Sequence, residues 1–495
     1  MNCSTLHRRI AIVFFLVFLA TPRCALNQEP VEQLAFDDID MDKLNAYDDT
    51  HPFRNPIKPE AMAAGLTLVK EPLWKSTTHP AGRDVLYLIP YKISAIEYGG
   101  FALNFFFNMT NNLNLTTNDL FSLESLVYPE SSIFEVIASF ISSTTTADEI
   151  KEFVPFFKKI TLQEYRSGML AQFGLNRGPF SFQVHSSFQL AVRNLWLSVA
   201  DRQILTDLLR QRFGVGDFNQ SEGYRLRFGL GDTRVRMGIN TLNAPSAQID
   251  VGLETILPTS RFSYSPNIQI GLAKAAFNDE EDLKLMLSNS VKGVRDYLLD
   301  PHLGNGHYGF GCYVEAKLGI FHDLIQWWNH LSYDVLFPDD EDRIFMFRKT
   351  LTPADIDART LGHAPSEETL DQYIRQYVFP SSFKSKVYPG GILNFVTAAN
   401  ADFTKRVRFA LGYDFYSQQA ERIKSIYSSE AKIQDLRIED TEVPSVYQHK
   451  IFSEILYHNP KPKSDFGIGV GGDITVGSRN IGEDWTFYIK VASSF

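Results

Sequence analysis

The last eleven residues of the chain, Trp485–Phe495, read W-T-F-Y-I-K-V-A-S-S-F. Successive side chains of a β-strand point to opposite faces, so residues two apart share a face. Hydrophobic residues occupy alternate positions here: Trp485, Phe487, Ile489 and Val491, followed by the terminal Phe495. This period of two predicts a strand with one apolar face, so the chain ends on a strand that separates two different environments.

The same alternation recurs upstream over most of the sequence. Residues 180–192 are an example, with apolar side chains at the even positions except Ser186 and mostly polar ones between them. We expect about 14 such segments by counting alternating runs. They span residues 98–109, 161–175, 179–193, 223–231, 233–242, 246–257, 266–276, 307–320, 325–337, 391–401, 404–416, 445–458, 464–477 and 483–495.

These segments predict an all-β fold, a closed antiparallel transmembrane β-barrel over residues 81–495. A tilted strand of roughly 9–11 residues crosses a bilayer. A closed barrel leaves no unpaired edge in lipid, and an even strand number brings both of its ends to one side. The alternative is an exported β-sandwich, which also alternates. Its strands are typically about 5–6 residues long, shorter than most of these segments.

Four stretches have apolar residues at helical rather than strand spacing. In the stretch 279–299, for example, Leu283, Leu287, Val291 and Val294 recur every three to four residues. The others lie near 131–159, 201–212 and 367–377. Irregular or helical backbone does not face lipid in a barrel wall. We therefore expect helical inserts in loops or over the lumen.

The N-terminus has the pattern of a secretory signal peptide over residues 1–25. The apolar run Ile10–Ala20 has 11 residues and follows Arg8 and Arg9. It is shorter than the roughly 20 residues of a spanning helix, although a membrane-anchor helix is the alternative. Export is the expectation.

Residues 26–80 differ in composition, being acidic and Pro-rich. They predict a solvated tail, with a plug of the barrel as the alternative. Removal of residues 1–25 takes away three Arg and no acid, so the formal net charge changes from -10 to -13. A chain this acidic is not expected to bind nucleic acid.

The sequence predicts no cofactor and no metal site. Cys312 is the single Cys beyond the predicted signal peptide, which excludes an intrachain disulfide and a Cys-based zinc site. His302, His307, His322 and His330 lack metal-binding spacing, and we expect loop or surface histidines. Gly467-x-Gly469-x-x-Gly472 matches a dinucleotide fingerprint in letters, but it lies inside an alternating segment. These glycines instead predict small inward-facing positions where lumen contents come close.

The terminal strand resembles that of Gram-negative outer-membrane β-barrel proteins, apart from Ser493, where those proteins carry an apolar or aromatic residue. This resemblance implies a location in the cell outer membrane after export. It also implies partners: outer-membrane lipid, and the barrel-assembly machinery, which would read Trp485, Phe487, Ile489, Val491 and Phe495. It further implies a porin-like or substrate-specific channel that passes small solutes.

If the apolar faces meet lipid, the charged faces line the lumen. The candidate lining residues are Arg225, Arg227, Arg234, Arg236, Asp250, Glu254, Glu315, Lys317, Arg406 and Arg408. A turn at Gly231-Asp232 would set Arg227 opposite Arg236. Opposed basic and acidic side chains resemble the constriction of porins.

Two alternatives to a channel stay open. The first is a structural or surface-interaction barrel whose lumen is closed by salt bridges and inserts. The second is an outer-membrane hydrolase, for which no Ser, His and carboxylate set can be assigned, so we expect no enzyme.

Overall fold

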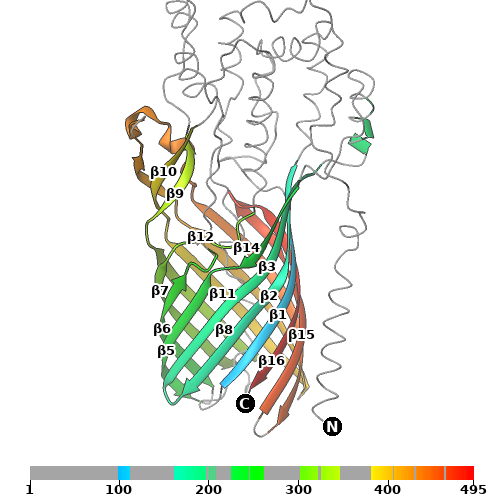
Figure 1. The fold of residues 1–495 in the computed structure, drawn as a ribbon. Helices are drawn as coiled ribbons and strands as arrows, with labels where there is room; N and C mark the ends of the chain where they lie inside the picture. The colour runs from blue at the N-terminus through cyan, green and yellow to red at the C-terminus, as the bar shows by residue number, and fades with distance from the viewer. Residues whose placement is uncertain are drawn as a thin grey trace, which may run out of the picture.

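Figure 1 shows a barrel of tilted strands. The computed structural model describes residues 99–111, 161–196, 224–244, 246–260, 301–320, 325–345, 381–404, 406–428, 431–461 and 464–494, with Ala200, Asp201, Gln203, Ile204 and Asp207. Its strands are β1 (Gly99–Asn111), β2 (Thr161–Arg177), β3 (Phe180–Trp196), β4 (Tyr224–Leu230), β5 (Thr233–Ala244), β6 (Ala247–Leu257), β7 (Gly309–Ile320), β8 (Ile325–Leu336), β9 (Asp339–Phe345), β10 (Ser381–Tyr388), β11 (Ile392–Thr404), β12 (Val407–Gln418), β13 (Arg422–Tyr427), β14 (Val446–Lys461), β15 (Ser464–Arg479) and β16 (Glu483–Ser494).

The wall closes because the first strand pairs with the last. β1 is antiparallel to β16, with Gly100 opposite Ser494, and to β2, with Gly100 opposite Gly174. The order round the ring is β1, β2, β3, β5, β6, β7, β8, β11, β12, β14, β15 and β16. The predicted closed antiparallel all-β barrel is therefore confirmed, and its backbone groups pair within the wall.

The barrel has twelve strands, fewer than the expected number of about 14. The predicted segments 223–231 and 233–242 exist as β4 and β5, but both pair with β3 and lie end to end along it. Phe188 faces Leu230 on β4, and His185 faces Arg234 on β5. The predicted segment 266–276 lies outside the described residues, and β6 pairs directly with β7.

The predicted reversal at Gly231-Asp232 is therefore wrong. Asp232 is a break within one wall strand, and its carboxylate accepts hydrogen bonds from the backbone N–H groups of Asn305 at 2.6 Å and Gly306 at 3.3 Å. Gly-Asp pairs are common in turns, but here the Asp232 carboxylate accepts hydrogen bonds from the backbone of a distant loop. Arg227 is consequently not opposite Arg236.

The two ends of the barrel differ in their connections. Five short turns join β2 to β3, β5 to β6, β7 to β8, β11 to β12 and β14 to β15. The first of them has Gly178 at φ 59°, a backbone angle that glycine adopts without strain. These turns lie at the end where β1 begins and β16 ends, whereas most of the longer connections lie at the other end. Outer-membrane barrels share this asymmetry of short and long connections.

The outer face of the wall is apolar, as the alternation predicts. Exposed large side chains come from strands all round the ring, and they include Phe173, Phe188, Phe228, Met237, Leu253, Phe310, Leu331, Leu411, Ile455, Val470, Trp485 and Phe487. Ile489 and Val491 are on the same face of β16 and are half-buried, whereas Phe495 lies outside the described residues. Cys312 also faces outward.

A second, three-stranded sheet was not predicted. β9 and β13 flank β10, and the small core of this sheet contains Phe345, Val387, Ile423 and Leu436. Two 3-10 helices, Ile433–Asp435 and Ile438–Asp440, follow β13. The sheet lies beyond the end of the barrel that has the long connections (Figure 1). Its strands have only 6–8 residues, and β9 is largely charged, so they lack the long alternation that identified the wall.

Several predictions fall on residues that the structure does not describe. They are the signal peptide 1–25, the segment 26–80 and the inserts at 131–159, 279–299 and 367–377. In the insert at 201–212, the described residues Asp201, Gln203, Ile204 and Asp207 have helical backbone. No helix among the described residues is both long and apolar enough to cross a membrane.

Candidate lumen site

The inner face of the barrel wall carries buried polar and charged side chains. Along β7, buried and exposed residues alternate strictly from Gly309 to Glu315. Among the predicted lining residues, Arg234, Arg236, Asp250, Glu254 and Glu315 are buried. Arg225, Arg227, Lys317 and Arg408 are half-buried, and Arg406 is exposed in the turn between β11 and β12.

Glu254 is the centre of the first charged cluster. Its two carboxylate oxygens accept hydrogen bonds from Arg234 and Arg236 on the neighbouring strand β5. Arg234 also donates to Asp334 on β8 at 2.7 Å. The space for this reach comes from Gly311 on β7, which lies directly opposite Glu254 on β6 and Asp334 on β8. The guanidinium groups therefore lie along the wall.

These ion pairs do not have the predicted arrangement, in which basic and acidic side chains oppose each other across the lumen. The ion pairs join side chains on one side of the ring, such as Arg236 on β5 to Glu254 on β6. Asp250 accepts a hydrogen bond from Ser181 at 3.0 Å, and Arg408 pairs with Asp402 at 2.7 Å. Local pairing shortens the range of each charge, because the partner cancels most of its field.

Tyr313 and His330 form part of a stack on the wall beside this cluster. The Arg236 guanidinium lies 5.4 Å from the centroid of the Tyr313 ring, within cation–π range. Tyr313 stacks on His330 at 5.9 Å, and His330 stacks on Trp328 at 6.0 Å. Trp328 donates to Glu315 at 2.8 Å, which fixes the carboxylate beside the stack. His330 is thus a buried strand residue, and its prediction as a loop or surface histidine is wrong.

Glycines on the inner face let aromatic rings lie flat against the wall. Tyr313 is opposite Gly252 on β6, and a Cβ added to Gly252 would lie only 2.7 Å from the Tyr313 ring. Phe452 covers Gly412 on β12 in the same way, and Tyr488 covers Gly471 on β15. Each ring occupies the space of a missing side chain on the next strand and projects less toward the axis.

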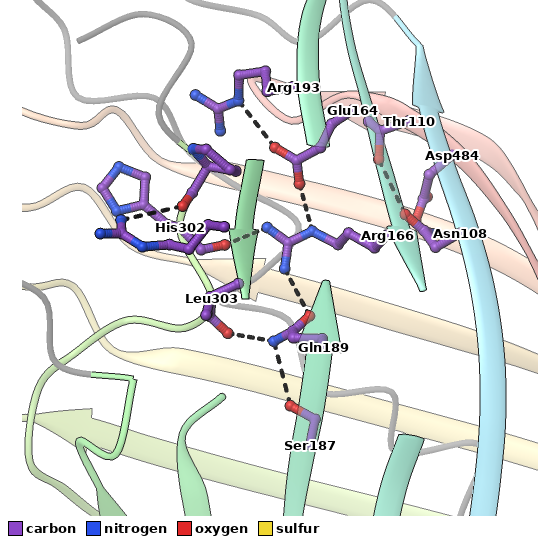
Figure 2. Close-up of polar contacts among 12 residues, drawn as sticks. Asn108, Thr110, Glu164, Arg166, Ser187, Gln189, Arg193, His302, Leu303 and Asp484 are labelled. Atoms are coloured by element: carbon purple, nitrogen blue, oxygen red, sulfur yellow. Dashed lines mark hydrogen bonds and ion pairs between the residues drawn. The ribbon is translucent and has the colours of Figure 1, made fainter. Parts of the chain in front are cut away.

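A second charged cluster involves β2 and β3. Figure 2 shows Glu164 between Arg166 and Arg193, both of which donate to its carboxylate, Arg193 at 2.9 Å. Arg166 also donates to Gln189 at 2.9 Å and to the backbone carbonyl of His302. A single carboxylate therefore holds two buried guanidinium groups, one of which reaches a loop.

That loop, residues 301–308, lies on the inner face of the wall. Gln189 donates to the Leu303 carbonyl at 2.6 Å, and Asp232 accepts from the backbone of Asn305 and Gly306. Leu303 itself is buried. The inner face of β2, β3 and the β4–β5 break thus binds the backbone of an inward-folded segment.

His307 joins this loop to the second sheet. Its imidazole contacts the Phe337 carbonyl at 3.0 Å and the Glu341 carboxylate at 2.5 Å, and Glu341 also pairs with Arg343 at 2.8 Å. Burial opposes the charged form of His307, but the hydrogen bond and charge of Glu341 outweigh it, and the pKa of His307 is raised. Burial likewise opposes the charge of Glu341, but Arg343 and His307 together lower the pKa of Glu341 to about 2. Glu341 is therefore charged at neutral pH, and its contact favours the charged form of His307.

A third charged cluster lies where β14, β15, β16 and β1 adjoin. Lys450 pairs with Asp473 at 2.8 Å and with Asp484 at 2.6 Å. Asp484 also accepts from Asn108 at 2.7 Å and Gln448 at 2.6 Å. The cluster bonds four strands through their side chains, next to the seam at which the barrel closes.

Sequence reasoning missed these other charged residues of the lumen. Glu164, Arg166 and Arg193 lie in predicted strands, as do Lys450 and Asp484. Their alternation with outward apolar residues was the available signal. It shows which face a residue occupies, but a charge cluster also requires the register between strands, which a single sequence lacks.

The described residues contain no group of three or more His, Cys, Asp or Glu side chains placed to hold a metal ion. The buried carboxylates of the three charged clusters pair with Arg and Lys instead. Their chemistry is that of ion pairing and hydrogen bonding within the wall.

Comparison with known proteins gave structural likenesses alone. No family model matches the sequence, and no curated protein matches it. Among solved structures, an outer membrane channel from Pseudomonas putida F1 is similar at a TM-score of 0.40 and 7% identity, covering 82% of this chain and 99% of that one. The Ralstonia pickettii toluene transporter TbuX is similar at a TM-score of 0.32 and 7% identity, covering 85% and 95%.

A third similar structure is a mutant of the monoaromatic hydrocarbon channel TodX. Its TM-score is 0.32 at 8% identity, and the match covers 85% of this chain and 96% of that chain. By their descriptions, the three solved structures are an outer membrane channel, a toluene transporter and a monoaromatic hydrocarbon channel. With TM-scores below 0.5, the likenesses carry no residue roles to this chain, and the lumen must be interpreted from its own contacts.

Proposed function

We propose that the chain is an outer-membrane β-barrel channel for small solutes. The observation that carries the proposal is the two-faced closed wall, which is apolar outside and polar inside. Water would surround such an outer face only at a large cost in exposed apolar area, whereas a bilayer accommodates it. The polar inner face then supplies hydrogen-bonding groups along a path through the membrane.

The inward-folded loop 301–308 is the constriction of this path in the proposal. Its backbone is held by Arg166, Gln189 and Asp232 through hydrogen bonds to backbone groups. The contacts to Gln189 and Asp232 need no charged side chain on the loop, because they are made to its backbone, and each contributes little alone. The loop would therefore set the width of the path and could be displaced one contact at a time.

Conductance in a planar lipid bilayer tests the channel directly. We expect the reconstituted wild type to pass small ions, and Asp232→Ala to raise the mean current because the loop loses its contacts to Asn305 and Gly306. The matched control is Asp340→Ala, which removes a carboxylate from the second sheet, where it pairs with Lys386 at 3.2 Å. No current from any of the three proteins would contradict the channel.

A structural barrel with a closed lumen is the second candidate. The observation that favours it is the burial of the lining charges, since Arg193, Glu254 and Lys490 are 0% exposed. Buried ion pairs fill space and fix geometry without conducting. This candidate predicts a folded barrel that shows the heat-dependent gel mobility shift of such proteins but carries no current.

The location and partners complete the proposal. Residues 1–25 would direct export, and the outer apolar belt would contact outer-membrane lipid. The terminal strand β16 would be recognised by the barrel-assembly machinery through Trp485, Phe487, Ile489, Val491 and Phe495. The protein would act without catalysis or a cofactor. Deletion of Phe495 should lower the amount of assembled barrel in outer-membrane fractions, measured by gel mobility shift.

A further inference from the structure

The second sheet, beyond the end of the barrel, has one buried face and one exposed face. Val387 on β10 and Ile423 on β13 are direct partners in its buried core. The strand positions between the core residues point to the opposite face. On that face the Lys384 side chain is 58% exposed, and its partner Tyr427 on β13 is 53% exposed. This exposed sheet face is therefore open to contact with another molecule.

The exposed sheet face is rich in cations, although the chain as a whole is acidic. β10 and β13 carry no Asp or Glu, whereas the whole chain has a formal net charge of -10. Their four cations are Lys384, Lys386, Arg422 and Lys424. The carboxylates of this face come from β9, where Asp340 and Asp342 lie opposite β10. Because the chain as a whole repels anions, an anionic partner would bind at such a local surplus of cations.

One carboxylate pairs with two of the four cations. Asp340 lies 3.2 Å from Lys386 and 3.6 Å from Lys384. Arg422 and Lys424 are exposed, and neither forms an ion pair within the part of the chain that the structure describes. These two charges are left to bind an anion.

Two tyrosine rings lie among these cations. Lys424 Nζ is 4.3 Å from the centroid of the Tyr388 ring, within cation–π range. The hydroxyl of Tyr427 donates to Asp340 at 3.2 Å, which holds its half-exposed ring on the sheet. A ring held in this way offers a flat apolar surface against which the C–H groups of a sugar can pack.

The length of the exposed sheet face indicates the shape of an occupant. Lys384 and Tyr388 are four residues apart along β10, a distance of roughly 13 Å. Their partners on β13 are Tyr427 and Arg422. An occupant that contacts both ends of the face must therefore be an extended chain. Repeated anionic groups would also be needed, because each exposed ion pair contributes little alone.

The position of the second sheet indicates which anionic chain could reach it. The sheet lies beyond the end of the barrel that has the long connections (Figure 1). In outer-membrane barrels these longer connections are on the cell exterior. Acidic polysaccharides are polymers of cell surfaces that combine carboxylates with apolar sugar faces. These are the two features that the cations and the tyrosine rings would contact.

We propose that the exposed sheet face binds an acidic polysaccharide, whose carboxylates pair with Arg422 and Lys424 and whose sugar rings pack on Tyr427. The inference goes beyond the proposed channel function, on which only the exterior position of the sheet rests. The polysaccharide lies outside the lumen, so its binding needs no open path through the barrel.

Microscale thermophoresis of the full-length protein in a nonionic detergent tests this surface, with polygalacturonate as the probe. We expect saturable binding by the wild type that weakens from about 0.05 M to about 0.5 M NaCl, because salt screens exposed charges. Arg422→Gln/Lys424→Gln should raise Kd at least about fivefold. The matched control is Arg177→Gln/Arg406→Gln, which removes two exposed Arg from the short-turn end of the barrel and should leave Kd unchanged.

The Tyr427 ring distinguishes a polysaccharide from other anionic polymers. Tyr427→Val removes the ring and should raise Kd for polygalacturonate at least about threefold, whereas Tyr427→Phe keeps the ring and should bind as the wild type does. Poly-L-glutamate of matched length has carboxylates but no sugar rings. It should bind to the wild type at least about fivefold more weakly than polygalacturonate.

Absence of polygalacturonate binding by the wild type, or an unchanged Kd in Arg422→Gln/Lys424→Gln, would overturn the surface. Both substituted side chains are exposed, so the buried core of the sheet is kept. Equal affinity for poly-L-glutamate would overturn the polysaccharide as the occupant. Polygalacturonate binding without ion current would contradict the channel and leave the surface standing, and ion current without binding would do the reverse.

Discussion

Glu254 illustrates at the residue scale how a charge is kept inside this barrel. Its carboxylate forms ion pairs with two guanidinium groups on β5, and all three side chains are almost fully buried. Burying an ion is costly, and the cost is offset only when partners satisfy its oxygens or protons. The loss of a shared partner should therefore cost more than the loss of any exposed one.

We expect Glu254→Gln to destabilise the barrel by about 3–5 kcal/mol, because Arg234 and Arg236 stay buried without their common carboxylate. Asp402→Asn is the control, since Asp402 pairs with Arg408 in a half-exposed position, and such pairs contribute roughly 0–1 kcal/mol. Urea unfolding in detergent micelles measures both. Equal effects of the two substitutions would contradict the role given to burial.

The contact of His307 with Glu341 should make loop 301–308 pH-dependent. The pKa of His307 is raised from 6.5 in the folded protein, so its stabilisation is complete below pH 6.5 and is lost as pH rises through the raised value. The pKa of Glu341 is lowered from 4.5 to about 2, so its stabilisation is lost as pH falls from 4.5 toward 2. The contact is strongest between these limits, at pH 4.5–6.5.

Hydrogen exchange of residues 301–308, corrected for intrinsic rates, measures this dependence. Protection should be greater at pH 6 than well above the raised pKa of His307. The variant His307→Asn should abolish the difference. The nearby Arg343 and Glu421, which pair at 3.1 Å, are the other charged groups at this contact. Unchanged protection over this pH range in the wild type would contradict the stabilisation of the loop by the contact of His307 with Glu341.

At the element scale, alternation identified every described strand of the wall but not the number of wall strands. The Gly-Asp pair at 231–232 looks like a turn, and only its contacts with Asn305 and Gly306 show that the strand continues past it. A contact between residues more than 70 positions apart is invisible to local pattern. Two predicted segments therefore became one wall strand.

The second sheet and the charge clusters were missed for related reasons. β9 reads D-D-E-D-R-I-F and has almost no apolar face, so an alternation of apolar and polar residues cannot identify it as a strand. Inward-facing charges such as Glu254 were found from alternation, whereas the partners of Glu164 and Lys450 depend on strand register. Packing against the neighbouring strand decides both features, and neither is encoded locally.

The glycine-backed rings give a prediction about the elements β12 and β14. Gly412→Leu should displace Phe452 from the wall toward the lumen axis, because the three atoms nearest to an added Cβ all belong to the Phe452 ring, within 2.7 Å. We expect a lower single-channel conductance and a loss of roughly 1–3 kcal/mol of stability. Ala399→Leu adds similar bulk to the outer face of β11 and should change neither. Equal conductance in the two variants would contradict the flat packing of the aromatic ring against the wall.

At the scale of the whole molecule, the apolar outer face of the wall predicts which side chains would touch lipid in the proposed outer-membrane location. Trp327 and Trp485 are 39% and 38% exposed on the outer face, whereas Trp328 is 3% exposed on the inner face. In vesicles of brominated lipid, Trp327→Phe and Trp485→Phe should each reduce the quenched part of the fluorescence. Trp328→Phe should leave it unchanged. A larger effect from Trp328→Phe would reverse the two faces of the wall.

Pairing of β1 with β16 closes the wall into a ring that has no edge strand. Gly100 and Ser494 are direct partners, so the two ends of the barrel segment are about 4.5–5.5 Å apart, the spacing of opposed residues in antiparallel strands. This seam is joined by the same ladder of hydrogen bonds as any other pair. A circular permutant, in which Gly99 is linked to Ser494 and the chain is cut in a long connection, would form the same ring of strands. The strands would then follow one another in a different order along the chain. Closure of the ring, more than the order of its strands along the chain, is what the sequence has to specify.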